Sequence, residues 1–207
     1  MSGLIISIII VLVTIIIDFI SKIVVMNTMI LGQEVTIIPN LLKFRFVYNT
    51  GAAFSSMDDA TWLLCIISLV ASIGLGYLVH KYHDYKKRCL LSTALSLVMG
   101  GTIGNFIDRF LTVIHSRNGV VDFIELYIGK VNIIGNSTFN IADAFLVVGV
   151  ILIVIDLIFF DMKKTNVIRK EEKDESINSD ETEEVSNETS NTPLKEETSD
   201  GESNNSN

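Results

Sequence analysis

The sequence predicts an integral membrane protein, mainly α-helical, with four transmembrane helices, small β elements at the outer membrane face and a disordered C-terminal tail. Three observations lead to this fold class. Hydrophobic residues make up 49% of the 207 positions, and the mean hydropathy of +0.46 is too high for an ordinary soluble domain. These residues gather in four long apolar runs. Two segments between the runs are typical of β-strands, and the final segment is polar and acidic.

The four apolar runs define the expected membrane core, residues 1–164. They cover about residues 4–26, 61–79, 89–107 and 141–160. Each run is close to the roughly 20 residues that a transmembrane helix needs. The first run follows no basic residue and has no small-residue cleavage site, so we expect a retained span and not a removed signal peptide.

Two basic segments set the expected orientation of these spans. Residues 80–88, "HKYHDYKKR", lie between the second and third runs, and residues 163–170 follow the fourth. Four spans place both segments on the same side, and the positive-inside rule makes that side cytoplasmic. Both termini are then expected inside, with residues 27–60 and 108–140 outside.

The two outer segments each contain a strand-like stretch. In residues 42–49, "LKFRFVYN", aromatic and cationic side chains alternate with a period of two, after a turn signal at Pro39-Asn40. Residues 119–128, "GVVDFIELYI", are also typical of a strand and are bounded by glycines. We therefore expect small β elements resting on the outer membrane face.

The C-terminal segment, residues 165–207, accounts for the acidity of the chain. It carries 13 acidic and 4 basic residues and almost no large apolar ones. Such a segment cannot bury enough surface to offset its ordering entropy, so we expect a disordered cytoplasmic tail. Its charge therefore says nothing about the partners of the membrane core.

Polar residues from four separate segments are expected to meet at one face of the membrane. Helices one and three run outward and helix four runs inward, so the alternation of the spans fixes them to a common side. Charges at membrane depth are costly and usually functional. These residues are Asp18, Lys22, Asn105, Asp108, Arg109, Asp122, Asn140 and Asp143.

Some of these residues also have a purely structural interpretation. Asp18 and Lys22 are spaced i, i+4 and could simply neutralise each other, so structural and functional roles remain equally open. Asp108 and Arg109 could mark the end of a span, which is the favoured interpretation of that pair. The Gly100-xxx-Gly104 spacing is expected to permit close helix packing.

A pair of aspartates suggests a specific chemistry. Asn140 could only cap the fourth helix, with Asp143 favoured in its first turn. That does not explain a second carboxylate, Asp122, among apolar neighbours in "VVDFI". Two partly desolvated carboxylates share a proton, and such a dyad can deprotonate water and protonate a leaving amine. This is peptide hydrolysis without a metal or a covalent intermediate.

Two other function classes compete with hydrolysis. A proton-coupled transporter or channel is possible because buried Asp and Lys also mark ion pathways. However, the carboxylates crowd one face, and no polar residue links Asp143 to Asp156 or Asp161 near the inner end. A non-enzymatic membrane scaffold would leave the convergence of Asp122 and Asp143 unexplained. Hydrolysis is therefore preferred.

Taken together, the motifs resemble those of the lipoprotein signal peptidases, also called signal peptidase II. Each motif is weak alone, but five occur in the right order on spans of the right direction. They are "DFISK" (18–22), "YNTGAAFS" (48–55), "GGTIGNFIDR" (100–109), "GVVDFI" (119–124) and "FNIADAF" (139–145).

The resemblance implies an aspartic endopeptidase with a small extracytoplasmic β-cradle above its four helices. The catalytic aspartates of the family fall on Asp122 and Asp143. Gly51 and Phe54, in the loop after the first predicted strand, would approach the substrate. The substrate-binding and supporting positions fall on Asp18, Lys22, Asn49, Gly51, Phe54, Asn105, Asp108, Arg109 and Asn140.

The resemblance also implies the substrate and location. The family removes signal peptides from prolipoproteins by cutting before the diacylglyceryl-modified cysteine. The expected enzyme is a monomer that needs no cofactor or metal. Its expected partners are the prolipoprotein and membrane lipid, and it is not expected to bind nucleic acid. It would be a multi-pass protein of the bacterial inner (cytoplasmic) membrane, with its active site at the outer face. The strand 42–49 and its loop could clamp the substrate from above.

Overall fold

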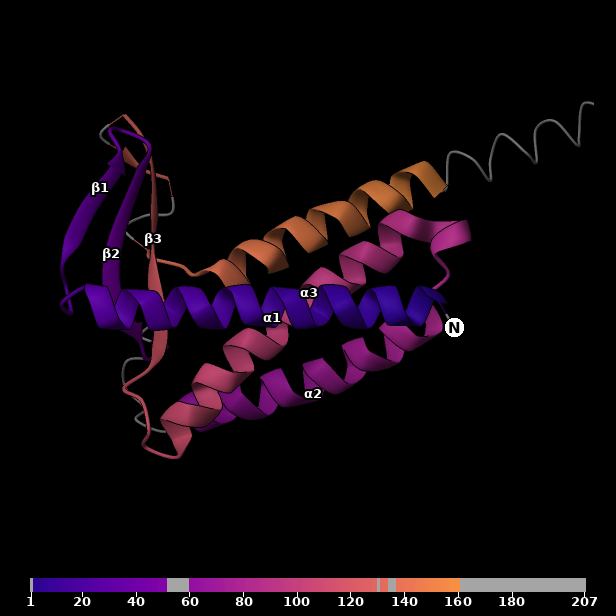
Figure 1. Ribbon diagram of the computed structural model, residues 1–207, viewed down its shortest axis with the longest axis horizontal. Helices are drawn as coiled ribbons and strands as arrows, with labels where there is room; N and C mark the ends of the chain where they lie inside the picture. Colours follow the sequence, from indigo (N-terminus) through magenta and orange to yellow (C-terminus); the bar gives the residue numbers. More distant parts are fainter. Residues whose placement is uncertain (1, 52–59, 130, 134–136, 161–207) are drawn as a thin grey trace, which may run out of the picture. The chain divides into compact units, whose positions relative to one another are not determined.

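A computed structural model describes residues 2–51, 60–129, 131–133 and 137–160 of the protein. Its described part contains four helices long and apolar enough to cross a membrane. This confirms the predicted four-helix membrane fold. The helices are α1 (Ser2–Thr28), α2 (Ala60–Lys81), α3 (Tyr85–Val113) and a fourth, Ile141–Phe160, drawn in orange in Figure 1. Phe54 and the predicted tail lie outside the described residues, and what we expect of them stays a prediction.

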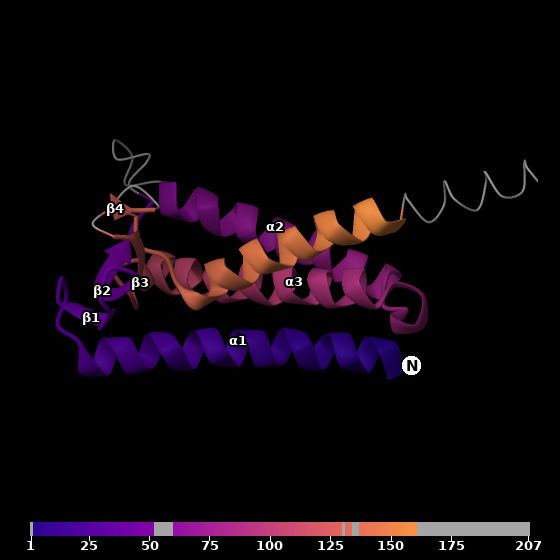
Figure 2. The same cartoon turned by 90° about the horizontal axis from the view of Figure 1, so that it is seen from above.

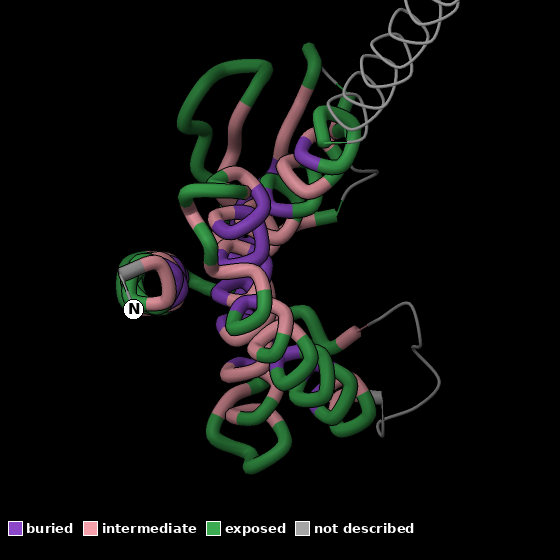
Figure 3. The backbone as a smooth tube through the Cα atoms, turned by 90° about the vertical axis from the view of Figure 1, so that its right-hand side faces the viewer, coloured by how far each residue is buried: buried purple, intermediate pink, exposed green. Residues whose placement is uncertain are grey.

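Helix α3 is the central helix of the four. Of its apolar stretch 56% is buried, against 17 to 22% in the other three helices. Figure 3 shows α1 from its N-terminal end, with its buried side turned toward the other helices. The outward sides of α1, α2 and the fourth helix expose many large apolar side chains, such as Ile9, Val70 and Ile151. A surface of this kind is suited to contact with lipid.

Glycines let α3 lie close to its neighbours at the level of the polar residues. A Cβ atom on Gly104 would lie 2.7 Å from Asp18 Oδ2 in α1 and 3.2 Å from Ala142 Cβ in the fourth helix. One on Gly101 would lie 2.5 Å from the Ala142 carbonyl oxygen. The close packing predicted from the glycine spacing is therefore present, although Gly101 contributes as well as Gly100 and Gly104.

A small antiparallel sheet lies at one end of the helices (Figures 1 and 2). Its strand order is β1-β2-β3-β4. The sheet confirms the predicted β elements, and β2 and β3 fall on the two segments predicted as strands. The strands are β1 (Glu34–Ile38), β2 (Leu42–Asn49), β3 (Val120–Ile128) and β4 (Val131–Asn132).

Apolar side chains hold the sheet against the end of α1. Phe46 of β2 and Val121 and Phe123 of β3 are buried in one cluster with Val25 of α1. The alternation of β2 and the apolar residues of β3 supply this buried face, because side chains two residues apart point to the same side of a strand. Strand β3 is thereby fixed next to the helix ends, and Asp122 lies between two of its buried residues.

The segment before the fourth helix runs back along β3. Ile124 donates its backbone N–H to the Phe139 carbonyl at 2.8 Å, and Phe139 donates to the Ile124 carbonyl at 3.0 Å. This bridge places Asn140, the next residue, beside Asp122. Strand β3 and the start of the fourth helix thus meet at one point.

Candidate active site

The N-terminus of the fourth helix carries Asn140 and Asp143. Asn140 Oδ1 accepts a hydrogen bond from the backbone N–H of Asp143 at 3.0 Å, and Asp143 Oδ2 accepts one from the backbone N–H of Asn140 at 3.2 Å. This reciprocal pair satisfies N–H groups that the first helical turn leaves without intrahelical partners. The capping predicted for Asn140 is present, and it also fixes the carboxylate of Asp143.

Two buried amides connect the carboxylates of Asp122 and Asp143. Asn140 donates from Nδ2 to Asp122 Oδ1 at 2.7 Å and to Asn105 Oδ1 at 3.1 Å. Asn105 donates in turn from Nδ2 to Asp143 Oδ1 at 2.7 Å. Both asparagines are at most 3% exposed. The amides therefore hold the two carboxylates in a defined arrangement, which a simple helix cap does not require.

Asn49, at the end of β2, holds the other oxygen of Asp122. Its Nδ2 donates to Asp122 Oδ2 at 2.9 Å, and its Oδ1 accepts the backbone N–H of Gly51 at 2.9 Å. Gly51 has φ +82°, a conformation that residues with a Cβ rarely adopt. The Gly51 backbone N–H thus helps to orient the Asn49 amide toward the carboxylate.

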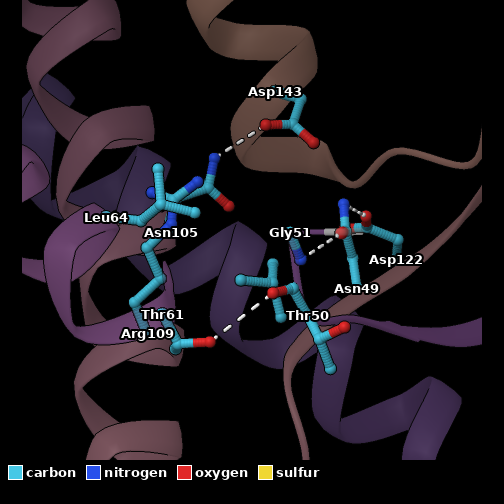
Figure 4. Close-up of a pocket in the computed structure, with 10 residues that line it drawn as sticks. Asn49, Thr50, Gly51, Thr61, Leu64, Asn105, Arg109, Asp122 and Asp143 are labelled. Carbon is cyan, nitrogen blue, oxygen red and sulfur yellow. Dashed lines mark hydrogen bonds between the residues drawn. The ribbon is translucent and has the colours of Figure 1, made fainter. Parts of the chain in front are cut away.

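A cavity of about 80 Å³ opens onto both carboxylates. Figure 4 shows Asp122 and Asp143 at its wall, with Asn105 and Arg109 of α3 and Thr61 and Leu64 of α2 around it. Its lining combines residues from the sheet and from three helices. The residues are Asn49, Thr50, Gly51, Thr61, Leu64, Asn105, Arg109, Val120, Asp122 and Asp143.

Burial changes the proton affinity of Asp122. This side chain is 2% exposed, and burial raises the pKa of Asp122 to about 7. The nearby Asp143 carboxylate raises the pKa further, whereas the hydrogen bonds from Asn49 and Asn140 lower it. Near neutral pH Asp122 can therefore either hold or release a proton, as a general acid or base must.

Four buried charges form an ion-pair cluster beneath this site. Lys22 Nζ lies 2.6 Å from Asp18 Oδ2 and 2.7 Å from Asp108 Oδ2. Arg117 forms a further ion pair with Asp108 Oδ1. All four side chains are at most 11% exposed. Two cations balance two anions, which is the condition under which buried charges are tolerated.

The cluster also contacts the backbone next to each carboxylate of the site. Asp18 Oδ1 accepts the backbone N–H of Ala142, which precedes Asp143, at 2.9 Å. Asp108 Oδ2 lies 3.5 Å from the backbone N–H of Val121, which precedes Asp122. Lys22 thus joins the two carboxylates that support the two sides of the site.

Arg109 and its neighbour Asp108 point to different partners. Arg109 donates to Ser68 Oγ of α2 at 2.8 Å and lines the cavity, whereas Asp108 lies within the ion-pair cluster. Helix α3 continues past this pair to Val113.

Three partners of the site do not stand out in the sequence: Arg117, Ser68 and Thr61. A signal for Arg117 does exist. Asp18, Lys22 and Asp108 sum to a charge of −1, so burying them requires one more cation. Ser68 and Thr61 have no comparable signal, since hydroxyl groups are common in apolar helices.

The structure brings most of the predicted site residues together in two layers. Asp122 and Asp143 line the cavity with Asn49, Gly51, Asn105 and Arg109, and Asn140 lies behind them as a bridge. Asp18, Lys22 and Asp108 lie outside the cavity lining. They contact one another and the backbone N–H of Ala142.

Comparisons with known proteins agree with this architecture. The model of a family described as signal peptidase (SPase) II matches residues 10–159. A lipoprotein signal peptidase of Listeria monocytogenes serotype 4b (strain CLIP80459) is 36% identical over 152 residues, which are 73% of this chain and 92% of the relative.

Solved structures agree as well. A bacterial membrane enzyme determined by the in meso method at 1.9 Å resolution superposes with a TM-score of 0.61 at 35% identity, covering 73% of this chain and 91% of that one. A second, at 2.3 Å resolution, gives a TM-score of 0.60 at 35% identity, with 73% and 87% covered. The family match covers all four helices and the sheet, and the chain therefore belongs to the signal peptidase II family.

Proposed function

We propose that this protein is an aspartic endopeptidase that removes signal peptides from prolipoproteins, cutting before a diacylglyceryl-modified cysteine. One observation carries the proposal: Asp122 and Asp143 line a single cavity and are connected by the amides of Asn105 and Asn140. A helix cap or a structural ion pair has no need of a second carboxylate on the same cavity. The family to which the chain belongs supports the choice of a peptidase.

In the proposed mechanism the two carboxylates share the proton transfers of peptide hydrolysis. The ionised carboxylate takes a proton from the attacking water, and the protonated one donates a hydrogen bond to the scissile carbonyl oxygen. As the C–N bond breaks, a proton passes to the leaving nitrogen. Burial of Asp122 favours its protonated form, which supports Asp122 as the group that holds the proton before attack.

Arg109 and the ion-pair cluster of Asp18, Lys22, Asp108 and Arg117 have separate proposed roles. Arg109 reaches the cavity from α3 and can donate hydrogen bonds to carbonyl oxygens of the substrate. The cluster holds the backbone beside each aspartate, so its function is to position them. The cluster thereby contributes to catalysis by holding the two aspartates in their reacting geometry.

The membrane determines how a substrate reaches the site. A lipid-modified cysteine keeps the scissile bond near the boundary between acyl chains and headgroups. The cavity is lined by residues of both the sheet and the helices, which meet at one end of the protein (Figure 1). We place this end of the protein at the outer face of the bacterial inner membrane, with both termini in the cytoplasm. The substrate then diffuses laterally through lipid to a monomeric enzyme.

The test is cleavage of a purified diacylglyceryl-modified prolipoprotein in detergent. Asp122→Asn and Asp143→Asn are each expected to lower kcat by about 10²- to 10⁴-fold, the usual contribution of a general acid or base. Asp84→Asn is the matched control. It removes one exposed carboxylate at the other end of the helices, and asparagine also accepts the cap hydrogen bonds from Lys86 and Lys87.

Two outcomes would contradict the proposal. Near-normal cleavage by either the Asp122 or the Asp143 variant would show that the two carboxylates do not form the catalytic pair. Loss of wild-type cleavage in EDTA, with recovery on adding a divalent metal ion, would show that the reaction depends on a metal and not on the dyad alone.

A further inference from the structure

A second hollow meets the catalytic cavity at Asp122. It is an open groove of about 300 Å³, lined by Arg45 and residues 47–50 at the end of β2, by Asp122 of β3, and by Ser137 and Thr138. Asn49, Thr50 and Asp122 line both hollows. A chain bound across the Asp122 carboxylate can therefore extend into each of them.

The two hollows differ in their surroundings. The cavity includes side chains of α2, α3 and the fourth helix, so it lies among the membrane helices. The groove has no helical residue in its lining and lies on the sheet. Its lining residues are mainly polar, with a guanidinium, a carboxylate, an amide and four hydroxyl side chains. One hollow is therefore suited to a segment that stays in the membrane, and the other to a segment that leaves it.

We propose that this groove is the subsite for the first residues of the mature lipoprotein, those that follow the modified cysteine, and that Arg45 binds their backbone carbonyl groups. The inference rests on the proposed function, because it assumes a peptide that is cut beside Asp122. The apolar signal peptide remains in lipid, whereas the mature segment must leave for water. The sheet side of Asp122 provides that exit.

Glu125 holds the two walls of the groove in place. This carboxylate is 1% exposed, and it accepts hydrogen bonds from Tyr127 Oη at 2.8 Å and Thr138 Oγ1 at 3.3 Å. Its Oε1 also lies 3.5 Å from a terminal nitrogen of Arg45. Arg45 belongs to one wall and Thr138 to the other, so a single buried carboxylate ties both to β3. A buried carboxylate is costly and persists where it has such partners.

Arg45 remains able to bind a ligand although it already contacts Glu125 and Glu34. Its side chain is 41% exposed, and its contacts with Glu125 and with Glu34, at 3.7 Å, involve Nε and one of the two terminal nitrogens. A guanidinium carries five N–H donors in a rigid fork, more than these two contacts use. The remaining donors suit carbonyl oxygens, which every peptide offers whatever its sequence.

The test compares two lipid-modified peptides with the same signal sequence. One ends at the amide of the modified cysteine, and the other continues for several mature residues. For the wild type we expect a KM about tenfold lower for the longer peptide, the effect of one hydrogen bond to a charged group. Arg45→Ala should bring the ratio of the two KM values close to one, and Arg45→Lys should restore part of it.

Lys43→Ala is the matched control. It removes the same charge from the same strand, and Lys43 also lies near Glu34, at 4.0 Å, but lines neither hollow. Its KM ratio should stay that of the wild type. The ratio is taken within each variant, so a loss of folded enzyme, which lowers both rates equally, does not change it.

Three results would overturn the inference. The first is a wild-type enzyme that does not distinguish the two peptides. The second is an Arg45→Ala variant that raises both KM values equally, and the third is a Lys43→Ala variant that changes the ratio as Arg45→Ala does. If the wild type cleaves neither peptide, the proposed function itself is wrong, and the groove inference falls with it.

Discussion

At the residue scale, Asp122 is subject to opposing influences on its charge. Burial and the Asp143 carboxylate favour the protonated form, and the amides of Asn49 and Asn140 favour the ionised form. The result is a carboxyl group whose pKa, about 7, lies near neutral pH instead of near 4. Brønsted behaviour makes such a group an effective acid or base at physiological pH, because both protonation states are accessible.

This balance predicts the pH dependence of the proposed reaction. If Asp122 must hold a proton before attack, activity should fall as the pH rises through about 7. Asn49→Ala removes a hydrogen bond that lowers the pKa of Asp122, so the pKa should rise and the alkaline limb of the kcat/KM profile should move to higher pH. Steady-state cleavage measured from pH 5 to 9 reports the limb. A limb that stays in place or moves to lower pH would contradict this assignment of the proton.

The position of the alkaline limb distinguishes an effect of Asn49 on the pKa of Asp122 from a role in folding alone. A residue that only helps the protein to fold would lower activity at every pH and leave the shape of the profile unchanged. Asn49 is exposed at the end of β2, and its amide is oriented by the Gly51 backbone. The structure therefore permits the alanine variant without a cavity in the core.

At the scale of secondary-structure elements, the close packing of α3 determines whether the site can form. Gly104 faces Ala142, in the first turn of the fourth helix, and the Asp18 carboxylate, which accepts the backbone N–H of Ala142. Gly104→Ala should therefore destabilise the protein by about 1–3 kcal/mol, the usual cost of overpacking. It should also lower kcat, because the added methyl group displaces the helix that carries Asp143.

Gly74→Ala in α2 is the control for this prediction. A Cβ atom at Gly74 would meet nothing within 4 Å, so the variant should keep wild-type activity and stability. The measurement is thermal unfolding and cleavage for both variants in the same detergent. Equal behaviour of the two would show that the contact at Gly104 does not constrain the site.

The sequence predicts some of these elements well and others poorly, for physical reasons. The strand β2 has a clear two-residue alternation of aromatic and cationic side chains, and β3 is recognisable as a mainly apolar run that is buried along most of its length. The strand β1 is exposed along its whole length, and β4 has two residues, so neither imposes such a pattern. The extension of α3 past residue 107 depends on partners elsewhere in the chain: Lys22 pairs with Asp108, and the Ser68 hydroxyl accepts a hydrogen bond from Arg109.

The same distinction applies to the site. The direction of each span is enough to gather Asp122, Asn140 and Asp143 at one end, and the structure does bring them together. Which polar residue contacts which depends on the tertiary structure. Arg117 and the Glu125 carboxylate come from segments outside the helices, and no periodicity in the sequence indicates their partners.

At the scale of the whole molecule, the described charges are concentrated at the two ends of the helices. The site and its ion-pair cluster occupy one end, and Arg88 pairs with Asp156 near the other. Between them the fourth helix is apolar from Ala144 to Ile155. A transporter would need a polar path through this region, so the distribution favours a site reached from one face. The positive-inside rule then predicts which face.

The orientation can be tested with single cysteines in a background of Cys65→Ala and Cys89→Ser. Val131→Cys on β4 is 69% exposed, and Lys87→Cys in the basic segment replaces a side chain that is 84% exposed. A membrane-impermeant maleimide should label Val131→Cys in intact spheroplasts and Lys87→Cys only after permeabilisation. Because both sites are exposed, a difference between them reports the side of the membrane and not burial. The reverse pattern would place the site in the cytoplasm, where a peptide cut beside Asp122 could not release its mature segment outside the cell.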